Sequence, residues 1–272
     1  MITLGFSTLT HKLPSVLQKI EKIKKEFKNN DLINCSDIFF QVVSQGEEDD
    51  LIEVVDNVKI FRCKEKGLSK SRNLNISNCC TRYLWTLDDD VYIDVGVLVE
   101  FMYELKSNDT CPAIYLAKVG ALEHNGYYKD YSYREGRVSP SKLQLLKSSS
   151  IELIIDVNFF KEHSITYNEA IGLGTEYPGA EENNLLLDVY NKGGFIKFVN
   201  YRMVLHTTLM DGRQAISNNI YLVRGATASR FDFVGVLLIV RWCIRLYRKP
   251  FEMLNAFYYL TYGYTKGYDY FK

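Results

Sequence analysis

Blocks of apolar and polar residues follow one another along the first hundred residues, and they predict strands and helices in turn. Short apolar runs rich in β-branched and aromatic residues predict strands at 2–7, 38–44, 58–63 and 83–87. Apolar residues at three- and four-residue spacing predict a helix that begins at Pro14 and a second helix within 67–80. This alternation favours an α/β fold with a largely parallel sheet.

The pattern is less regular in the middle of the chain. The segment 124–142 is polar and aromatic and contains Gly and Pro, so we expect a flexible segment near a site. Strand character returns at 151–160, a Gly-rich loop followed by a helix is expected at 171–194, and extended structure at 195–208.

The last segment, 229–272, has a pattern of its own. Residues 233–240 are apolar apart from one glycine, and a helix would place four arginines within a narrow arc: Arg230, Arg241, Arg245 and Arg248. Such a helix is typical of a membrane interface. We expect it to end at Pro250, before a second aromatic helix at 251–264. The alternative is a helical subdomain that packs on the sheet or forms a homodimer.

Composition restricts the partners. The 272 residues include 33 Lys and Arg and 33 Asp and Glu, so no global field attracts nucleic acid. Six cysteines without a C-x-x-C pair argue against a zinc site or a disulfide framework. No signal peptide is visible, and no apolar run reaches the roughly 18–20 residues that span a bilayer. These features favour a cytoplasmic protein.

Three consecutive carboxylates follow the strand predicted at 83–87. Side chains alternate along a strand, so Asp88 and Asp90 can share one side, with Asp89 between them. Paired carboxylates suit Mg²⁺ or Mn²⁺, which commonly bridge protein oxygens to phosphate. The alternative is a solvated acidic turn.

A basic segment, GLSKSRN at 67–73, precedes that strand. Lys70 and Arg72 lie just inside a predicted helix start, where cationic side chains and the helix N-terminus favour phosphate. An ordinary amphipathic helix with a basic face would also explain the pattern.

The order of these motifs resembles inverting glycosyltransferases of family 2, which have the GT-A nucleotide-diphosphosugar-binding fold. The matching residues are Gly67, Ser69, Arg72, Asn73 and Asp88 to Asp90. The resemblance extends over about residues 2–208. It implies an α/β GT-A domain at 1–210, with a nucleotide-sugar-binding half at 1–105 and an acceptor-binding half at 106–210. A C-terminal helical segment at 211–272 would follow.

A second motif, GLGTEYPGAEENNLLL, resembles the galactosyltransferase-like branch of the family. The resemblance implies that Gly179 and Glu181 contact the acceptor and that Glu182 or Glu181 is the catalytic base, with Glu182 favoured by position. The chain has Glu-Glu where relatives have Glu-Asp. The alternative is a pair of acids that complement the helix dipole.

The resemblance also assigns His206 as a third metal ligand beside the aspartates; otherwise a lone histidine is structural. It places the nucleoside against Ser7, Thr8 and Gln45, and the remainder of the donor against Gly67, Lys70, Arg72, Asn73, Asp88 and Asp89. Relatives carry Asp near the position of Gln45.

The resemblance implies transfer of galactose or N-acetylgalactosamine from a UDP-sugar, with Mn²⁺ or Mg²⁺, to a glycan acceptor. We expect this acceptor to be lipid-linked and the product to be a bacterial surface polysaccharide such as O-antigen or capsule. The enzyme would work at the inner face of the cell membrane. Two alternatives are a sugar-nucleotide nucleotidyltransferase and a non-catalytic carbohydrate-binding protein. The first would carry a Gly-rich basic loop after its first strand, and STLTHKLPS lacks one.

Overall fold

The computed structural model describes residues 1–28, 37–107, 111–175, 177–208 and 218–270. Its main sheet has eight strands in the order β10-β7-β9-β5-β1-β2-β4-β3. The strands are β1 (Ile2–Leu9), β2 (Ile38–Gln45), β3 (Leu51–Val55), β4 (Val58–Cys63), β5 (Tyr83–Asp88), β7 (Ile114–Leu116), β9 (Leu153–Asp156) and β10 (Ile196–Phe198). A smaller sheet contains β6 (Tyr92–Ile93), β11 (Val204–His206) and β8 (Val119–Ala121).

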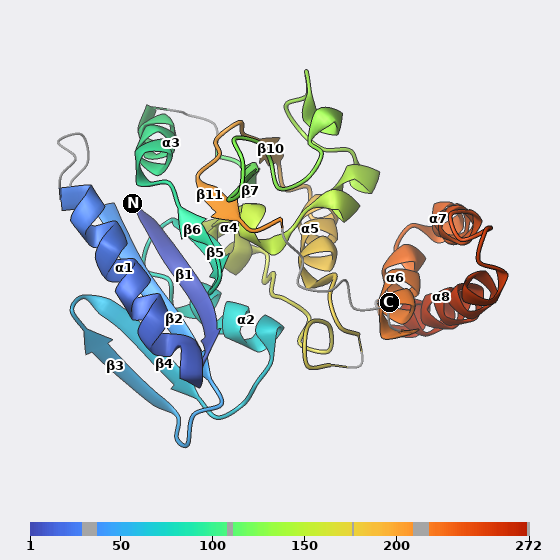
Figure 1. The fold of residues 1–272 in the computed structure, drawn as a ribbon, viewed down its shortest axis with the longest axis horizontal. Coiled ribbons are helices and arrows are strands. Elements are labelled where there is room, and N and C mark those ends of the chain that lie inside the picture. Colours follow the sequence, from blue (N-terminus) through green and yellow to red (C-terminus); the bar gives the residue numbers. More distant parts are fainter. Residues whose placement is uncertain (29–36, 108–110, 176, 209–217, 271–272) are drawn as a thin grey trace.

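Helices cover both faces of the main sheet (Figure 1). They are α1 (Leu13–Lys28), α2 (Leu68–Asn78), α3 (Val95–Ser107), α4 (Val157–Glu162) and α5 (Glu181–Asn191). Short 3-10 turns occur at Thr10–Lys12, Ser132–Arg134, Lys142–Lys147 and Ser150–Glu152. One core lies under α1 and α3, and a second under α2, α4 and α5, because successive strand residues point to opposite faces. Leu84 thus joins the second core and Trp85 the first.

The parallel strands end together at one edge of the sheet. β1 pairs in parallel with both β2 and β5, which sets Ser7 beside Asp88 and Leu9 beside Gln45. Ligands of open α/β sheets bind at the carboxyl ends of such strands. The register therefore brings three separate sequence segments to one place.

The predicted fold class is confirmed: a mixed, mostly parallel sheet flanked by helices. One local prediction needs correction, and one strand was not predicted. The strand expected at 151–160 ends at Asp156, whose carboxylate accepts hydrogen bonds from the backbone amides of Asn158 and Phe159 and starts α4. Strand β3 was not predicted; it pairs antiparallel with β4 across a tight turn in which Asp56 and Asn57 have positive φ.

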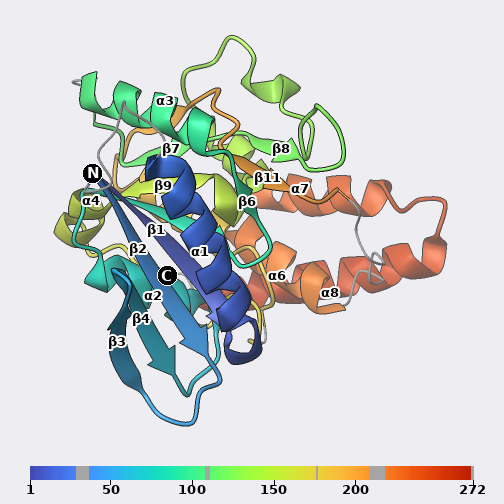
Figure 2. The ribbon, with the colours of Figure 1, turned by 60° about the vertical axis from the view of Figure 1, so that its left-hand side comes forward.

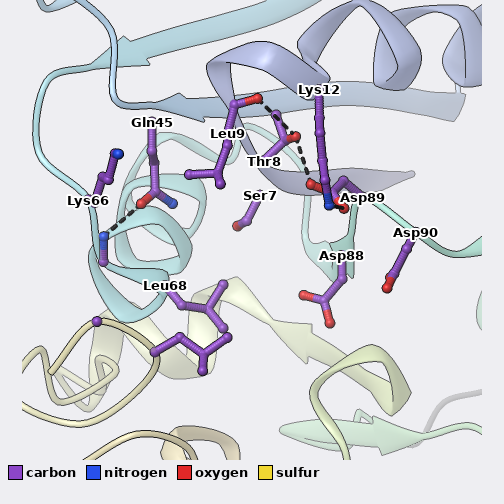
Figure 3. A pocket seen from close by; sticks show the side chains of 13 residues that line it. Ser7, Thr8, Leu9, Lys12, Gln45, Lys66, Leu68, Asp88, Asp89 and Asp90 are labelled. Carbon is purple, nitrogen blue, oxygen red and sulfur yellow. Dashed lines mark hydrogen bonds and ion pairs between the residues drawn. The ribbon is translucent and has the colours of Figure 1, made fainter. Parts of the chain in front are cut away.

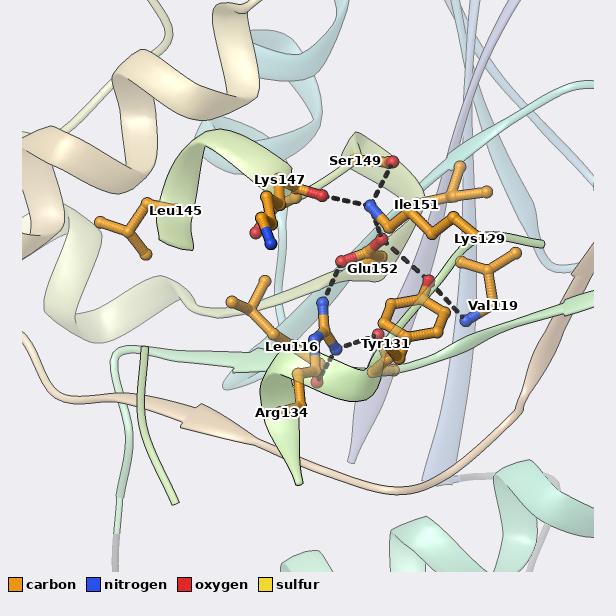
Figure 4. Close-up of polar contacts among 12 residues, drawn as sticks. Leu116, Val119, Lys129, Tyr131, Arg134, Leu145, Lys147, Ser149, Ile151 and Glu152 are labelled. Carbon is orange, nitrogen blue, oxygen red and sulfur yellow. Dashed lines mark hydrogen bonds and ion pairs between the residues drawn. The ribbon is translucent and has the colours of Figure 1, made fainter. Parts of the chain in front are cut away.

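The segment 124–142, expected to be flexible, is held by a buried charge cluster (Figure 4). Glu152 is fully buried and pairs with Arg134 and Lys129, and it accepts a 3.0 Å hydrogen bond from the hydroxyl of Tyr131. Removing either partner of a buried ion pair is costly, so this cluster fixes the segment against the sheet.

The C-terminal helices α6 (Asn218–Ser229), α7 (Asp232–Ile244) and α8 (Pro250–Tyr270) form a group beyond α5 (Figures 1 and 2). Glycines allow α6 and α8 to touch: a Cβ on Gly225 would lie 2.1 Å from the carbonyl oxygen of Leu260. Pro250 is the first residue of α8 and does not end a helix that continues from 229, since α7 already ends at Ile244. The boundary expected at 210/211 lies outside the described residues.

The predicted arginine stripe is also divided. Arg230 does not face outward; it pairs with Asp188 and donates a 2.7 Å hydrogen bond to the carbonyl oxygen of Asn184, which ties the turn after α6 to α5. Arg248 instead contacts Tyr247. No helix in the described part of the chain is long and apolar enough to cross a membrane.

Candidate active site

The three aspartates after β5 face different partners. Asp88 accepts a 3.0 Å hydrogen bond from the guanidinium of Arg72. Asp89 accepts bonds from the hydroxyl of Thr8, at 2.9 Å, and from the ammonium of Lys12, at 2.8 Å. Contacts with positive and hydroxyl groups offset the repulsion among neighbouring carboxylates. Asp89 therefore links the ends of β1 and β5, whereas the remaining aspartate is turned elsewhere.

Asp90 lies beside His206, which the small sheet delivers from β11. The Nε2 atom of His206 is 3.4 Å from Oδ2 of Asp90, and 57% of the Asp90 side chain is exposed. The contact lowers the pKa of the Asp90 carboxyl and raises the pKa of the His206 imidazole, because each stabilises the charged form of the other. The structure brings together these two residues, which lie 116 positions apart in the sequence.

An imidazole and a carboxylate oxygen fit Mn²⁺, and a carboxylate alone fits Mg²⁺. Within the described residues, no three His, Cys, Asp or Glu side chains converge as a metal site. The oxygens of Asp88 are engaged by Arg72 and, at 3.3 Å, by the hydroxyl of Ser150. The donor set thus fits a cation held by two protein ligands, Asp90 and His206, with further positions left for phosphate oxygens.

Arg72 is the central cation of the site. Only 2% of its side chain is exposed, and it reaches Asp88 with one nitrogen and Oε1 of Glu181 with another, at 2.7 Å. Its guanidinium also lies 5.5 Å from the ring centre of Tyr167. The nearby carboxylates hold the pKa of Arg72 above its usual value despite burial. A single charged group therefore joins the end of β5 to the start of α5.

The other residues of GLSKSRN mostly hold the backbone. The amide of Gly67 donates a 2.7 Å hydrogen bond to the side-chain oxygen of Gln45. The side chain of Asn73 bonds both the amide and the carbonyl of Tyr167. Lys70 pairs with Glu65 at the surface and is not brought to the aspartates. Of the two cations expected to bind phosphate, Lys70 lies on another face of the protein, and Arg72 is already paired with carboxylates.

A cavity of about 400 Å³ opens at the carboxyl ends of β1, β2 and β5 (Figure 3). It is lined by Ser7, Thr8, Leu9, Lys12, Gln45, Lys66, Gly67, Leu68, Asp88, Asp89, Asp90, Leu173 and Gly174. The cavity collects the predicted nucleoside residues and the aspartates. Sequence reasoning missed its two cations, Lys12 and Lys66. Both stand just after strand ends, which was the available signal.

The glutamate pair opens α5. Glu181 is 6% exposed; one oxygen binds Arg72, and the other is buried without a hydrogen-bond partner among the described residues. Glu182 is partly exposed in a second cavity, of about 660 Å³, which Gly179 also lines. Burial and the charge of Glu181 raise the pKa of Glu182 to about 8, with Arg72 opposing. A carboxyl with such a pKa can exchange protons near neutral pH.

Residues 36–159 match the sequence profile of Glycosyl transferase family 2, a range that includes GLSKSRN and the three aspartates. No curated protein matches the chain. Among solved structures, S. aureus TarS 1–349 in complex with UDP-GlcNAc superimposes with a TM-score of 0.62 at 15% identity, over 85% of this chain and 66% of that one.

Another structure of TarS 1–349 gives a TM-score of 0.61 at 15% identity, over 85% of this chain and 65% of that one. S. aureus TarS itself gives 0.56 at 15% identity, over 84% and 39%. This chain thus spans just under two thirds of TarS 1–349, and at such identity the likeness establishes the fold. The segment 36–159 thus matches glycosyl transferase family 2, a family of sugar-transferring enzymes, and the described structure has the GT-A fold.

Proposed function

We propose that this chain transfers a hexose from a UDP-sugar to a hydroxyl group of a glycan acceptor, with inversion at the anomeric carbon. The observation that supports this most directly is the Arg72 bridge. Arg72 binds Asp88, on the wall of the 400 Å³ cavity, and Glu181, the first residue of α5. The bridge sets the candidate base, Glu182, at a fixed place relative to the candidate donor pocket.

The donor would occupy the 400 Å³ cavity. Ser7, Thr8 and Gln45 offer hydroxyl and amide groups at the ends of β1 and β2, where a pyrimidine and ribose can form hydrogen bonds. Lys12 and Lys66 add positive charge near the aspartates, which suits a diphosphate. Gly67 is part of the same wall, so backbone can approach the ligand closely there.

Asp90 and His206 would hold Mn²⁺ or Mg²⁺, and Asp88 lies on the same cavity wall. When bound, the cation neutralises charge on the diphosphate leaving group. The protein contributes the position of the two ligands, which comes from the pairing of β11 with β6 directly after the aspartates.

The acceptor step is a single displacement. The acceptor oxygen forms a bond to the anomeric carbon, the bond from that carbon to the diphosphate oxygen breaks, and UDP leaves with the electron pair. Glu182 takes the hydroxyl proton in its carboxylate form. The unpartnered buried oxygen of Glu181 can accept a hydrogen bond from another acceptor hydroxyl. No covalent nucleophile is needed.

The sugar is proposed from resemblance. The galactosyltransferase-like motif suggests galactose or N-acetylgalactosamine, while the similar TarS 1–349 structure contains UDP-GlcNAc. UDP-GlcNAc therefore belongs in the same donor panel. The product we envisage is a bacterial surface polysaccharide of the O-antigen or capsule kind.

The C-terminal helices would rest on the inner face of the membrane and bring the site to a lipid-linked acceptor. α7 and α8 expose large apolar side chains on their surface, including Phe233, Leu237, Ile244, Phe251, Leu254, Phe257 and Tyr258. Phe251 is 88% exposed, at the bend between the two helices. Exposed apolar helices with neighbouring Arg and Lys suit a lipid interface rather than water.

The test is UDP release from UDP-Gal, UDP-GalNAc, UDP-GlcNAc and UDP-Glc with Mn²⁺ and a glycan acceptor, for wild type and Glu182→Gln. We expect the substitution to reduce kcat by a factor of about 10² to 10⁴. Glu162→Gln, at an exposed site on α4, is the matched control and should leave the rate unchanged. Equal rates for both variants would contradict the proposal, and binding of UDP without turnover in wild type would favour a non-catalytic protein.

A further inference from the structure

The second cavity, of about 660 Å³, lies between the start of α5 and the C-terminal helices. Apolar residues form much of its wall, among them Leu238, Trp242 and Leu246. The charged residues on the wall are Lys147, Glu182, Arg224, Arg241 and Arg245. Four cations and one carboxyl therefore surround a space large enough for part of a substrate.

Three of those cations are arginines. Arg224, Arg241 and Arg245 have no carboxylate at ion-pair distance among the residues that the structure describes. Five other arginines of the same described part do pair with carboxylates: Arg62, Arg72, Arg82, Arg134 and Arg230. Glu252, an acid of the same tail, is already engaged by Lys249 and by the hydroxyl of Tyr221.

Arg224 shows what this arrangement costs. Its side chain is only partly exposed, and burial together with the positive charge of Arg245 lowers the pKa of its guanidinium. Protein interiors seldom keep like charges together without a compensating anion. Arg241 and Arg245 are exposed to solvent, whereas Arg224 is half-buried, so the cost of the missing anion is concentrated at Arg224. A ligand of opposite charge in the cavity would stabilise Arg224 and attract the other two arginines.

The charged groups on the wall indicate the chemical class of that ligand. Three guanidinium groups exceed what one carboxylate balances, and their planar forks match the oxygens of phosphate. Glu182 is on the same wall, so a ligand bound there reaches the candidate base. We propose that this cavity binds a phosphate or diphosphate group of the acceptor and so holds the reacting hydroxyl near Glu182.

This inference rests on the proposed function, because it gives the acceptor its chemical class. Two sources share that chemistry: a lipid-linked diphosphate, and a soluble glycan that carries phosphodiesters. The apolar wall formed by Trp242 and Leu246 beside the arginines would favour the first source.

The test is calorimetric titration of inorganic pyrophosphate into the full chain saturated with UDP, so that the donor pocket is filled. Arg224→Gln and Arg245→Gln should each weaken pyrophosphate binding about tenfold or more, since charge-assisted hydrogen bonds to phosphate are lost. Arg248→Gln is the matched control on the same tail, outside the cavity wall, and should bind like wild type. UDP affinity should be unchanged in all three variants.

Farnesyl diphosphate replaces pyrophosphate in a second arm. Tighter, arginine-dependent binding of farnesyl diphosphate would identify a lipid-linked source, and equal arginine-dependent binding would identify a soluble one. The inference would be overturned if neither substitution weakened pyrophosphate binding, or if pyrophosphate did not bind to the UDP-saturated wild type. If the wild-type chain did not bind UDP, the proposed function itself would be refuted. Failure of the inference and failure of the proposed function are therefore distinguishable.

Discussion

Replacing Arg72 by methionine tests whether one buried cation holds the two halves of the site together. The substitution keeps an unbranched, flexible side chain, although a shorter one, and removes the charge. Glu181, 6% exposed, would then carry an uncompensated charge, and Asp88, which is more open to solvent, would lose part of its stabilisation. Removing one partner of a buried ion pair lowers the free energy of unfolding by about 3–5 kcal/mol. Because Asp88 is partly open to solvent, we expect a loss of about 3 kcal/mol for Arg72→Met.

Urea denaturation followed by circular dichroism measures this loss, and thermal unfolding should show a decrease of roughly 6–12 °C in Tm for a chain of this size. Lys70→Met, two residues earlier on α2 and paired with Glu65 at the surface, is the matched control and should cause little change. Adding Glu181→Gln to Arg72→Met should recover part of the stability, because it removes the stranded carboxylate. Equal stability of the Arg72 and Lys70 variants, or no recovery in the double variant, would refute the reasoning.

Three further predictions follow from the same contacts. The pKa of Glu182 is about 8 in the fold, against 4.5 ordinarily, so the folded state retains a proton between those two values. The stability that this proton gives wild type is lost as pH rises from about 4.5 to about 8, so the free energy of unfolding of Glu182→Gln should increase relative to that of wild type over this interval in urea titrations and level off above it. Wild-type kcat/KM should increase as the carboxylate forms near pH 8. Gly225→Ala should cost about 1–3 kcal/mol, since its Cβ would meet the carbonyl of Leu260, whereas Gly96→Ala on α3 should cause no loss in the same melt. Asp90→Asn should raise the Mn²⁺ concentration for half-maximal activity by about tenfold or more, and a chelator should abolish wild-type turnover; activity indifferent to both would exclude the proposed metal site.

Much of the fold could be predicted from the sequence because buried parallel strands consist of continuous runs of apolar residues. The strands at β1, β2, β4 and β5 were found in this way, and their order placed the aspartates at a strand end. β3 was missed because an edge strand with both faces largely exposed carries no such signal. The strand at 151–160 was extended too far since periodicity alone cannot show that Asp156 caps a helix.

The candidate site was less accessible to sequence reasoning, because partners are set by long-range contacts. The sequence indicated Arg72 as a phosphate ligand, but its guanidinium forms an ion pair with Glu181, 109 positions later in the chain. Lys12 and Lys66 were not among the predicted site residues, because only the strand register places them on the cavity wall. The arginine stripe read from the tail assumed one straight helix; the break between α7 and α8 and the contact of Arg230 with α5 divide it.

A crystal structure of the chain with UDP and Mn²⁺ tests the central claim most directly. The account predicts uridine at Ser7, Thr8 and Gln45, with the diphosphate and the cation beside Asp90 and His206. A nucleotide bound elsewhere, or a diphosphate turned away from Asp90 and His206 with Mn²⁺ absent from both, would contradict it.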